Sequence, residues 1–182
     1  MRRIRYNAAI SLDGFIASPD GSTDWIIEDA SIDFDTLHAE FDCHIMGRKT
    51  YEAVTSYQGA NPLAAKAKEN VLVVSRTMKQ EDYPGITILR HDFIDTIRQL
   101  KAQQGRDMWF MGGGQLAAAL CEARLIDVVE MAVMPAVVGR GIKMIAGSGG
   151  TALSGYRLDL RAVERLHTSG IVTLKYAVLY DC

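Results

Sequence analysis

The stretch "MWFMGGGQLAAALCEARLID", from Met108 to Asp127, decides the fold. An apolar run typical of a buried strand ends at three glycines, and an Ala- and Leu-rich helix pattern follows at once. Glycine lets a backbone approach its neighbours closely, and the first N–H groups of a helix attract anions. The stretch therefore predicts a strand, a turn and a helix, and the turn is either simply tight or a cradle for a phosphate group.

Apolar, β-branched runs alternate with helical patterns along the rest of the chain. Helical spacing of apolar residues predicts helices over residues 30–41 and 92–103, besides the helix after the glycines. Two alternating runs around Thr168, Ser169 and Gly170 predict a C-terminal antiparallel hairpin. The order predicts an α/β fold with a mixed, mostly parallel sheet flanked by helices. The strands of this prediction are residues 3–10, 44–47, 71–75, 86–90, 108–111 and 128–134.

Composition narrows the function classes. A length of 182 residues suits a single domain over residues 1–182, and a net charge of -2 leaves no basic surplus for nucleic acid. No apolar run reaches the roughly 18 residues of a membrane span, so we expect no membrane binding. Three isolated cysteines argue against a disulfide framework and favour the cytoplasm, and the four histidines lack metal-ligand spacing, so no metal is expected.

Three predicted turns carry residues that suit a phosphate. Carboxyl ends of parallel strands meet at one edge of a sheet, so these turns should lie together. The first has two cations and a hydroxyl ahead of a helix, and the second pairs a hydroxyl with a guanidinium, which suits the 2′-phosphate of NADPH. Plain loop chemistry is the alternative for each turn alone. The residues are Gly47, Arg48, Lys49 and Thr50; Ser75 and Arg76; and Gly112, Gly113, Gly114 and Gln115.

The order of these turns excludes a Rossmann fingerprint. That motif belongs to the first strand and helix, with an acid at the end of the next strand. Here the glycines follow most of the predicted strands, Asp127 precedes the next strand, and Glu130 lies inside it. The predicted cradle is therefore of another kind.

Five motifs, in their order and spacing, resemble the dihydrofolate-reductase-like superfamily, and within it most closely the reductase domain of the bifunctional riboflavin-biosynthesis deaminase-reductase. They are "AAISLDGFIASPDGSTDW", "IMGRKTYE", "VLVVSRT", "FMGGGQL" and "LIDVVEMAVMPAVVGRGIKMI". The resemblance implies an NADPH-dependent reductase that passes hydride to a C=N or C=O of a small heterocyclic or sugar-linked substrate. This would be the reaction type of 5-amino-6-(5-phosphoribosylamino)uracil reductase. It also implies a homodimer.

The resemblance assigns roles to individual residues. The three turns would hold the phosphates and ribose of NADPH, and Ala9 and Ile16 would flank the nicotinamide. The substrate would lie near Asp13, Trp25 and Phe34.

The source of the proton stays open. The carboxylate that folate enzymes carry on their first helix has no counterpart here, because that position falls on Ala30 or Ser31. The proton would come from one of the two catalytic candidates, Asp13 and Asp33, through a water molecule, or directly from solvent. Two alternatives remain: a true dihydrofolate reductase with a displaced carboxylate, and a non-catalytic nucleotide-binding protein.

Overall fold

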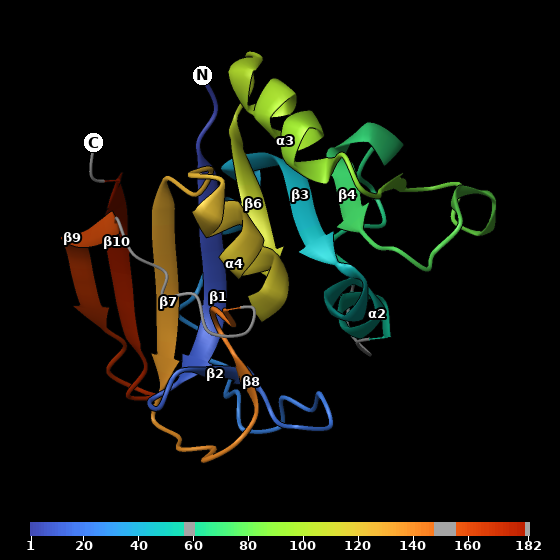
Figure 1. Ribbon diagram of the computed structural model, residues 1–182. Helices are drawn as coiled ribbons and strands as arrows, with labels where there is room; N and C mark the ends of the chain where they lie inside the picture. The colour runs from blue at the N-terminus through green and yellow to red at the C-terminus, as the bar shows by residue number, and fades with distance from the viewer. Residues whose placement is uncertain (57–60, 148–155, 181–182) are drawn as a thin grey trace.

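The chain builds a central sheet of eight strands, and the computed structural model describes residues 1–56, 61–147 and 156–180. The first six strands of this sheet along the chain pair in parallel, whereas the last strand is antiparallel to both of its neighbours. In spatial order the strands are β5 (Thr87–Leu89), β4 (Val71–Val74), β3 (Phe41–Gly47), β6 (Asp107–Gly112), β1 (Ile4–Ser11), β7 (Val128–Met134), β10 (Val172–Tyr180) and β9 (Tyr156–Arg165) (Figure 1).

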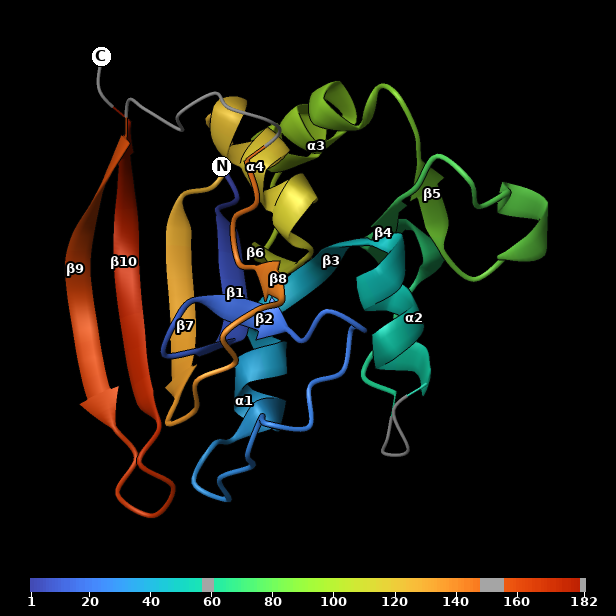
Figure 2. The ribbon, with the colours of Figure 1, turned by 60° about the horizontal axis from the view of Figure 1, so that its bottom comes forward.

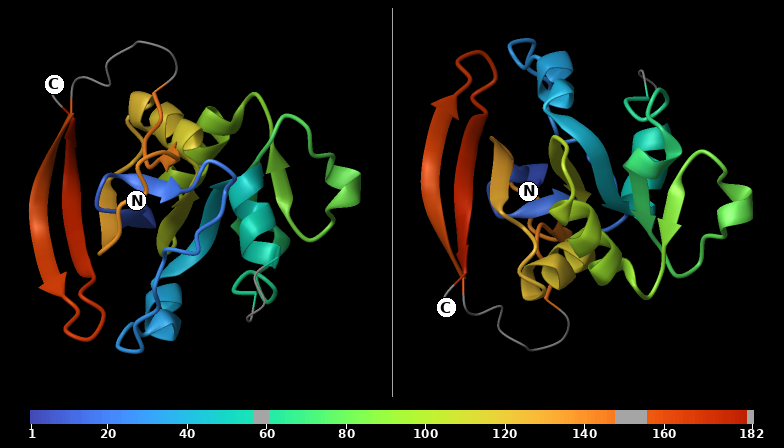
Figure 3. Two further views of the ribbon diagram at one scale, coloured as in Figure 1. Left: turned by 90° about the horizontal axis from the view of Figure 1, so that it is seen from below. Right: turned by 90° about the horizontal axis from the view of Figure 1, so that it is seen from above.

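This topology confirms the predicted fold class, a mixed and mostly parallel sheet with an antiparallel hairpin at one edge. Helices cover both faces, as Figures 2 and 3 show. None of the helices within the described residues is long and apolar enough to cross a membrane. The helices are α1 (Phe34–Ala39), α2 (Arg48–Ser56), α3 (Phe93–Ala102) and α4 (Gly114–Glu122), with short 3₁₀ turns η1 (Lys68–Asn70) and η2 (Gln80–Asp82).

Successive side chains of a strand point to opposite faces of the sheet, so each face packs against its own layer of helices. Ile45 of β3 packs in the main core with Ile97 of α3 and Leu120 of α4. Met46, the next residue, packs on the opposite face in a second cluster that includes Val54 of α2. Because the central strands are buried on both faces, they appear in the sequence as continuous apolar runs.

The predicted helix over residues 30–41 is wrong in extent. α1 begins at Phe34 because Asp33 caps it, its side chain accepting a hydrogen bond from the Thr36 N–H. Phe41 belongs to β3 and is fully buried, whereas Phe34 is 53% exposed. The apolar residues of this segment therefore do not share one helix face. Spacing alone could not show that the sheet takes Phe41.

A second, two-stranded sheet escaped prediction. Its strands β2 (Phe15–Ala17) and β8 (Ile142–Lys143) are antiparallel and lie beside the main sheet. Three and two residues are too few for a periodic signal, so only tertiary contact defines these strands.

Candidate functional site

The structure brings together the three turns that were expected to bind phosphate, at residues 47–50, 75–76 and 112–115. β4, β3 and β6 are neighbours in the sheet, and Gly47 pairs with Val74 while Met46 pairs with Gly112. Each of these strands ends at its turn, so the turns lie along one edge of the sheet. The expectation that they meet is confirmed.

Two helices begin at this edge and point their N-termini toward it. α2 starts at Arg48 directly after β3, and α4 starts at Gly114 directly after β6. Neither helix has an acidic residue in its first turn, and α4 has no side-chain cap within the described chain. A Cβ added to Gly113 would lie 3.9 Å from Thr50 Oγ1, so the two helix starts face each other. Free N–H groups at two helix starts favour a bound anion.

Glycine occupies the positions at this edge for different physical reasons. Gly112 has a φ of +118°, which favours glycine, whereas a Cβ on Gly114 would lie only 2.2 Å from the Lys143 carbonyl oxygen. Gly114 therefore serves the packing of α4 against β8. A Cβ on Gly47 or Gly113 would meet no atom closer than 3.9 Å. Packing does not exclude a side chain at these two positions, so the space beside them is open to a bound group.

The two residues predicted in the turn after β4, Ser75 and Arg76, have different surroundings. Ser75 is buried, and its hydroxyl oxygen accepts hydrogen bonds from the N–H groups of Thr77 and Met78. Ser75 therefore shapes the turn. Arg76 is exposed and lies outside the residues that line the neighbouring hollow. Lys49 and Gln115 are exposed as well.

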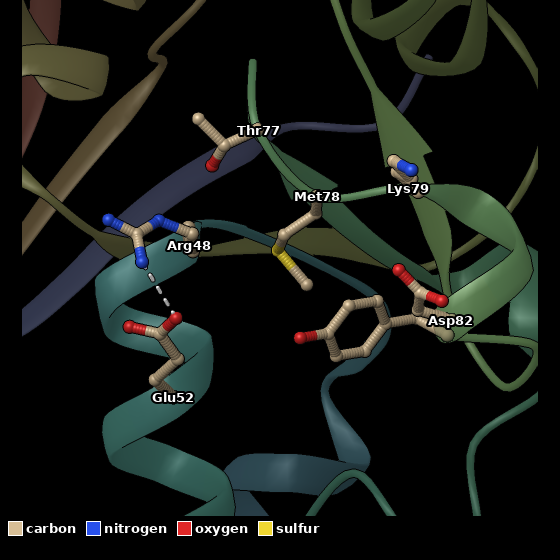
Figure 4. Close-up of a pocket in the computed structure, with 7 residues that line it drawn as sticks. Arg48, Glu52, Thr77, Met78, Lys79 and Asp82 are labelled. Atoms are coloured by element: carbon tan, nitrogen blue, oxygen red, sulfur yellow. Dashed lines mark hydrogen bonds and ion pairs between the residues drawn. The ribbon is translucent and has the colours of Figure 1, made fainter.

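A hollow between α2 and the segment after β4 collects charged and polar side chains, as Figure 4 shows. Arg48 lies at its rim and forms an ion pair with Glu52 at 2.9 Å. Thr77 and Lys79 add a hydroxyl and a second cation. They are absent from the sequence-based prediction because they lie two and four residues beyond Ser75, past the strand end. The lining residues are Arg48, Glu52, Thr77, Met78, Lys79, Asp82 and Tyr83.

Asp13 joins two distant loops. Its carboxylate accepts hydrogen bonds from the Ser11 hydroxyl at 2.7 Å and from the N–H groups of Val138 at 3.1 Å and Gly139 at 2.7 Å. The Ser11 bond, followed by the two backbone bonds, lowers the pKa of Asp13 to about 2. The carboxylate therefore stays ionised at neutral pH, which suits an anchor better than a proton donor.

Asp33, the other acidic candidate, is occupied as a helix cap. Its carboxylate accepts hydrogen bonds from the Thr36 hydroxyl, at 2.6 Å, and from the Thr36 N–H. These two bonds lower the pKa of Asp33. The side chain is exposed at the start of α1.

The other residues expected around the nicotinamide and substrate lie in three different surroundings. Ile16 lies against the glycine turn, since a Cβ on Gly112 would be 3.9 Å from its Cδ1. Ala9 and Trp25 pack against one cluster of buried residues, and the indole N–H of Trp25 is buried without a hydrogen-bond partner in the described chain. Phe34 is exposed at the start of α1. The structure thus places Ile16 at the glycine turn and Ala9 and Trp25 in one cluster, while Phe34 faces solvent.

A sequence model of the RibD C-terminal domain family matches residues 2–172. The chain belongs to that family. The protein YyaP of Bacillus subtilis (strain 168) is 28% identical to it over 184 residues, which cover 96% of this chain and 94% of YyaP. The resemblance inferred from the five motifs is confirmed.

Solved structures agree on the fold of this RibD C-terminal domain family member. A Shewanella sp. PV-4 protein ascribed to riboflavin biosynthesis superposes with a TM-score of 0.77 at 24% identity, covering 97% of this chain and 98% of that one. Dihydrofolate reductase from Enterococcus faecalis, complexed with NADP(H), superposes with a TM-score of 0.61 at 12% identity, covering 98% of this chain and 95% of that one. The fold is therefore that of dihydrofolate reductase and the RibD reductases.

One charged cluster of this family member was not predicted. Glu130 of β7 is buried, and its carboxylate accepts hydrogen bonds from Arg5 at 2.7 and 3.0 Å, from Lys175 at 2.7 Å and from Asn7 at 3.2 Å. Burial would raise the pKa of Glu130, but the bonds from Lys175 and Arg5 outweigh it and lower the pKa. Glu130 is thus a buried carboxylate that is ionised at neutral pH. In the sequence it is a single acid within an apolar strand.

Proposed function

We propose that this chain is an NADPH-dependent reductase that transfers hydride to a C=N or C=O carbon of a small heterocyclic or sugar-linked molecule. The reaction type would be that of 5-amino-6-(5-phosphoribosylamino)uracil reductase. The observation that carries the proposal is the pair of helix N-termini facing each other across Gly47 and Gly113, where packing leaves room beside the backbone. Membership of the RibD C-terminal domain family, and the NADP(H) complex of a structural neighbour, support it.

The residues present fit a nicotinamide dinucleotide. The pyrophosphate would lie between the starts of α2 and α4, against Gly47, Thr50 and the segment 112–115. The 2′-phosphate would lie beside Ser75 and the exposed Arg76, as the sequence predicts. At the adjoining hollow, Arg48 and Lys79 would supply further positive charge and Thr77 a hydroxyl. Bound NADPH would supply the hydride.

The chain's own contribution would be positioning. Ala9 and Ile16 would flank the nicotinamide ring, and Trp25 would cover the acceptor from the apolar cluster around Met134. Holding donor and acceptor carbons at reacting distance and excluding water accounts for much of the acceleration in such reductases.

The geometry gives less support to true dihydrofolate reduction. Asp33, the acid expected to substitute for the carboxylate of folate enzymes, faces solvent and caps α1. No observation favours a non-catalytic nucleotide-binding protein over an enzyme.

We also propose that two copies of the chain pair through the edge hairpin. Leu158, Leu160 and Val163 of β9 are 45%, 51% and 62% exposed. Their partners on β10 are Val178, Tyr176 and Leu174. These partners are two residues apart along the strand, so they and the three β9 residues share one face of the sheet. A second copy would cover this apolar strip, as the family resemblance implies.

A fluorescence titration with NADPH and NADH tests the cofactor assignment. In Arg48→Ala and Lys79→Ala we expect NADPH affinity to fall about 10- to 150-fold, the range for one lost charge-assisted hydrogen bond. NADH affinity should barely change, because NADH lacks the 2′-phosphate. Arg98→Ala is the matched control, since Arg98 is exposed on α3 and forms its ion pair with Asp95 of the same helix. If wild type binds neither dinucleotide, the reductase assignment is wrong.

A further inference from the structure

Asn7, Glu130 and Lys175 form one row across three neighbouring strands. Asn7 of β1 pairs with Glu130 of β7, and Glu130 pairs with Lys175 of β10. The Glu130 side chain contacts both of the others, accepting hydrogen bonds from the Asn7 amide and from the Lys175 ammonium. They therefore lie on the same face of the sheet.

The adjacent row on that face, nearer the carboxyl ends of β1 and β7, consists of Ala9, Ala132 and Thr173. Residues two apart on a strand point to the same face and are about 7 Å apart along it. Ala9 and Ala132 carry only methyl groups, so side chains from the neighbouring row can reach a molecule lying over them. The proposed function places the nicotinamide at Ala9. The Lys175 ammonium, bonded to Glu130 on the strand next to β1, therefore lies one row back from Ala9 and about one strand to the side.

The charges of the row fix the position of Lys175. The Glu130 side chain is 10% exposed and shared with the buried guanidinium of Arg5, whereas the Lys175 side chain is 39% exposed. Among the described residues, Glu130 is the one partner of the Lys175 ammonium. An ammonium has three N–H donors, so two remain for a ligand. A lysine with a solvent-facing end would ordinarily move freely, but a buried carboxylate holds this one.

We propose that Lys175 is an acceptor-contacting residue: its ammonium, held by Glu130, donates a hydrogen bond to an oxo oxygen of the molecule being reduced. The inference rests on the proposed function for the place of the acceptor. The site would then recognise the carbonyl edge of the acceptor. An ammonium donor matches a carbonyl edge and opposes a diaminopyrimidine edge, which presents N–H donors of its own.

Calorimetric titration of the NADP⁺-saturated protein tests the contact, with 6-aminouracil as the oxo probe and trimethoprim as the diaminopyrimidine probe. We expect wild type to bind 6-aminouracil more tightly than trimethoprim. In Lys175→Met the 6-aminouracil affinity should fall about tenfold or more, and Lys175→Arg should restore part of it. Lys68→Met, an exposed lysine in η1, is the matched control and should behave as wild type.

Three outcomes would overturn the assignment of Lys175. These are unchanged 6-aminouracil affinity in Lys175→Met, tighter binding of trimethoprim than of 6-aminouracil, and no 6-aminouracil binding by wild type. NADPH affinity, measured in the same variants, separates this failure from that of the proposed function. The NADPH affinity should be equal in wild type and Lys175→Met. If wild type does not bind NADPH, the proposed reductase function is wrong. Titration of the two probes without cofactor would then still decide the role of Lys175.

Discussion

At the scale of the residue, the same chemical group serves different ends according to its partners. Asp13 precedes a glycine and would pass for a local turn residue. In the structure its carboxylate binds backbone N–H groups more than 120 residues away, at Val138 and Gly139. Gly141 completes this junction, because a Cβ there would lie 2.1 Å from the Ala17 carbonyl oxygen. Two motifs far apart in sequence thus form one junction.

His44 of β3 is fully buried, and neither ring nitrogen has a hydrogen-bond partner within the described residues. Its ring lies near those of Trp109 and His38. Burial, followed by the charges of Lys66 and His38, lowers the pKa of His44 to about 4. In the unfolded chain a histidine has its ordinary pKa of about 6.5. As the pH falls, the unfolded state therefore binds the proton before the folded state does.

We therefore expect the free energy of unfolding to be highest above pH 6.5 and to decrease as the pH falls toward 4. For a single group with these pKa values the loss between pH 7.5 and pH 5 is roughly 2 kcal/mol. Urea unfolding at the two pH values measures it. His44→Phe, which keeps an aromatic ring beside Trp109, should lose most of this dependence, whereas His167→Asn on the exposed hairpin turn should retain it. Equal pH dependence in His44→Phe and wild type would contradict the account.

At the scale of the element, the candidate site depends on where strands end and helices begin. β3 and β6 each lead into a helix without an intervening loop of acidic or capping side chains. The glycines at these junctions separate into those required by packing and those that leave space. This distinction makes the site testable by single methyl groups.

Gly114→Ala should lower the stability of the protein, whereas Gly47→Ala should lower its affinity for NADPH. A methyl group at 114 would collide with the Lys143 carbonyl, so we expect a loss of about 1–3 kcal/mol in the free energy of unfolding. A methyl group at 47 has no neighbour closer than 4.0 Å, so stability should stay near that of wild type. NADPH affinity should nevertheless fall roughly tenfold in Gly47→Ala, because the methyl group occupies the proposed cofactor space. Urea unfolding and the NADPH titration measure the two effects, and unchanged affinity in Gly47→Ala would place the cofactor elsewhere.

At the scale of the whole molecule, the sheet is covered unevenly. Helices lie over both faces of its parallel part, while the β9–β10 hairpin extends beyond them at one edge (Figures 2 and 3). An exposed edge strand with apolar residues is a natural pairing surface. This is why we assign the proposed dimer contact to the hairpin.

Light scattering after size-exclusion chromatography tests that assignment. Wild type should elute with the mass of two chains of 20.0 kDa, and Leu160→Glu should shift it toward one. Glu164→Gln, on the same strand but paired with Thr173 in the alternate register, should leave the mass unchanged. A monomeric wild type would show that the strip has another role.

The sequence by itself determined the fold class, the terminal hairpin and the meeting of three turns at one sheet edge, because buried parallel strands and glycine-bounded helix starts leave local patterns. Only the tertiary structure decided the length of α1, the anchoring of Asp13, the hollow with Thr77 and Lys79, and the row that Glu130 forms with Asn7 and Lys175. These depend on contacts between residues distant in the chain, and a short polar side chain carries no local signal of the partner it will meet.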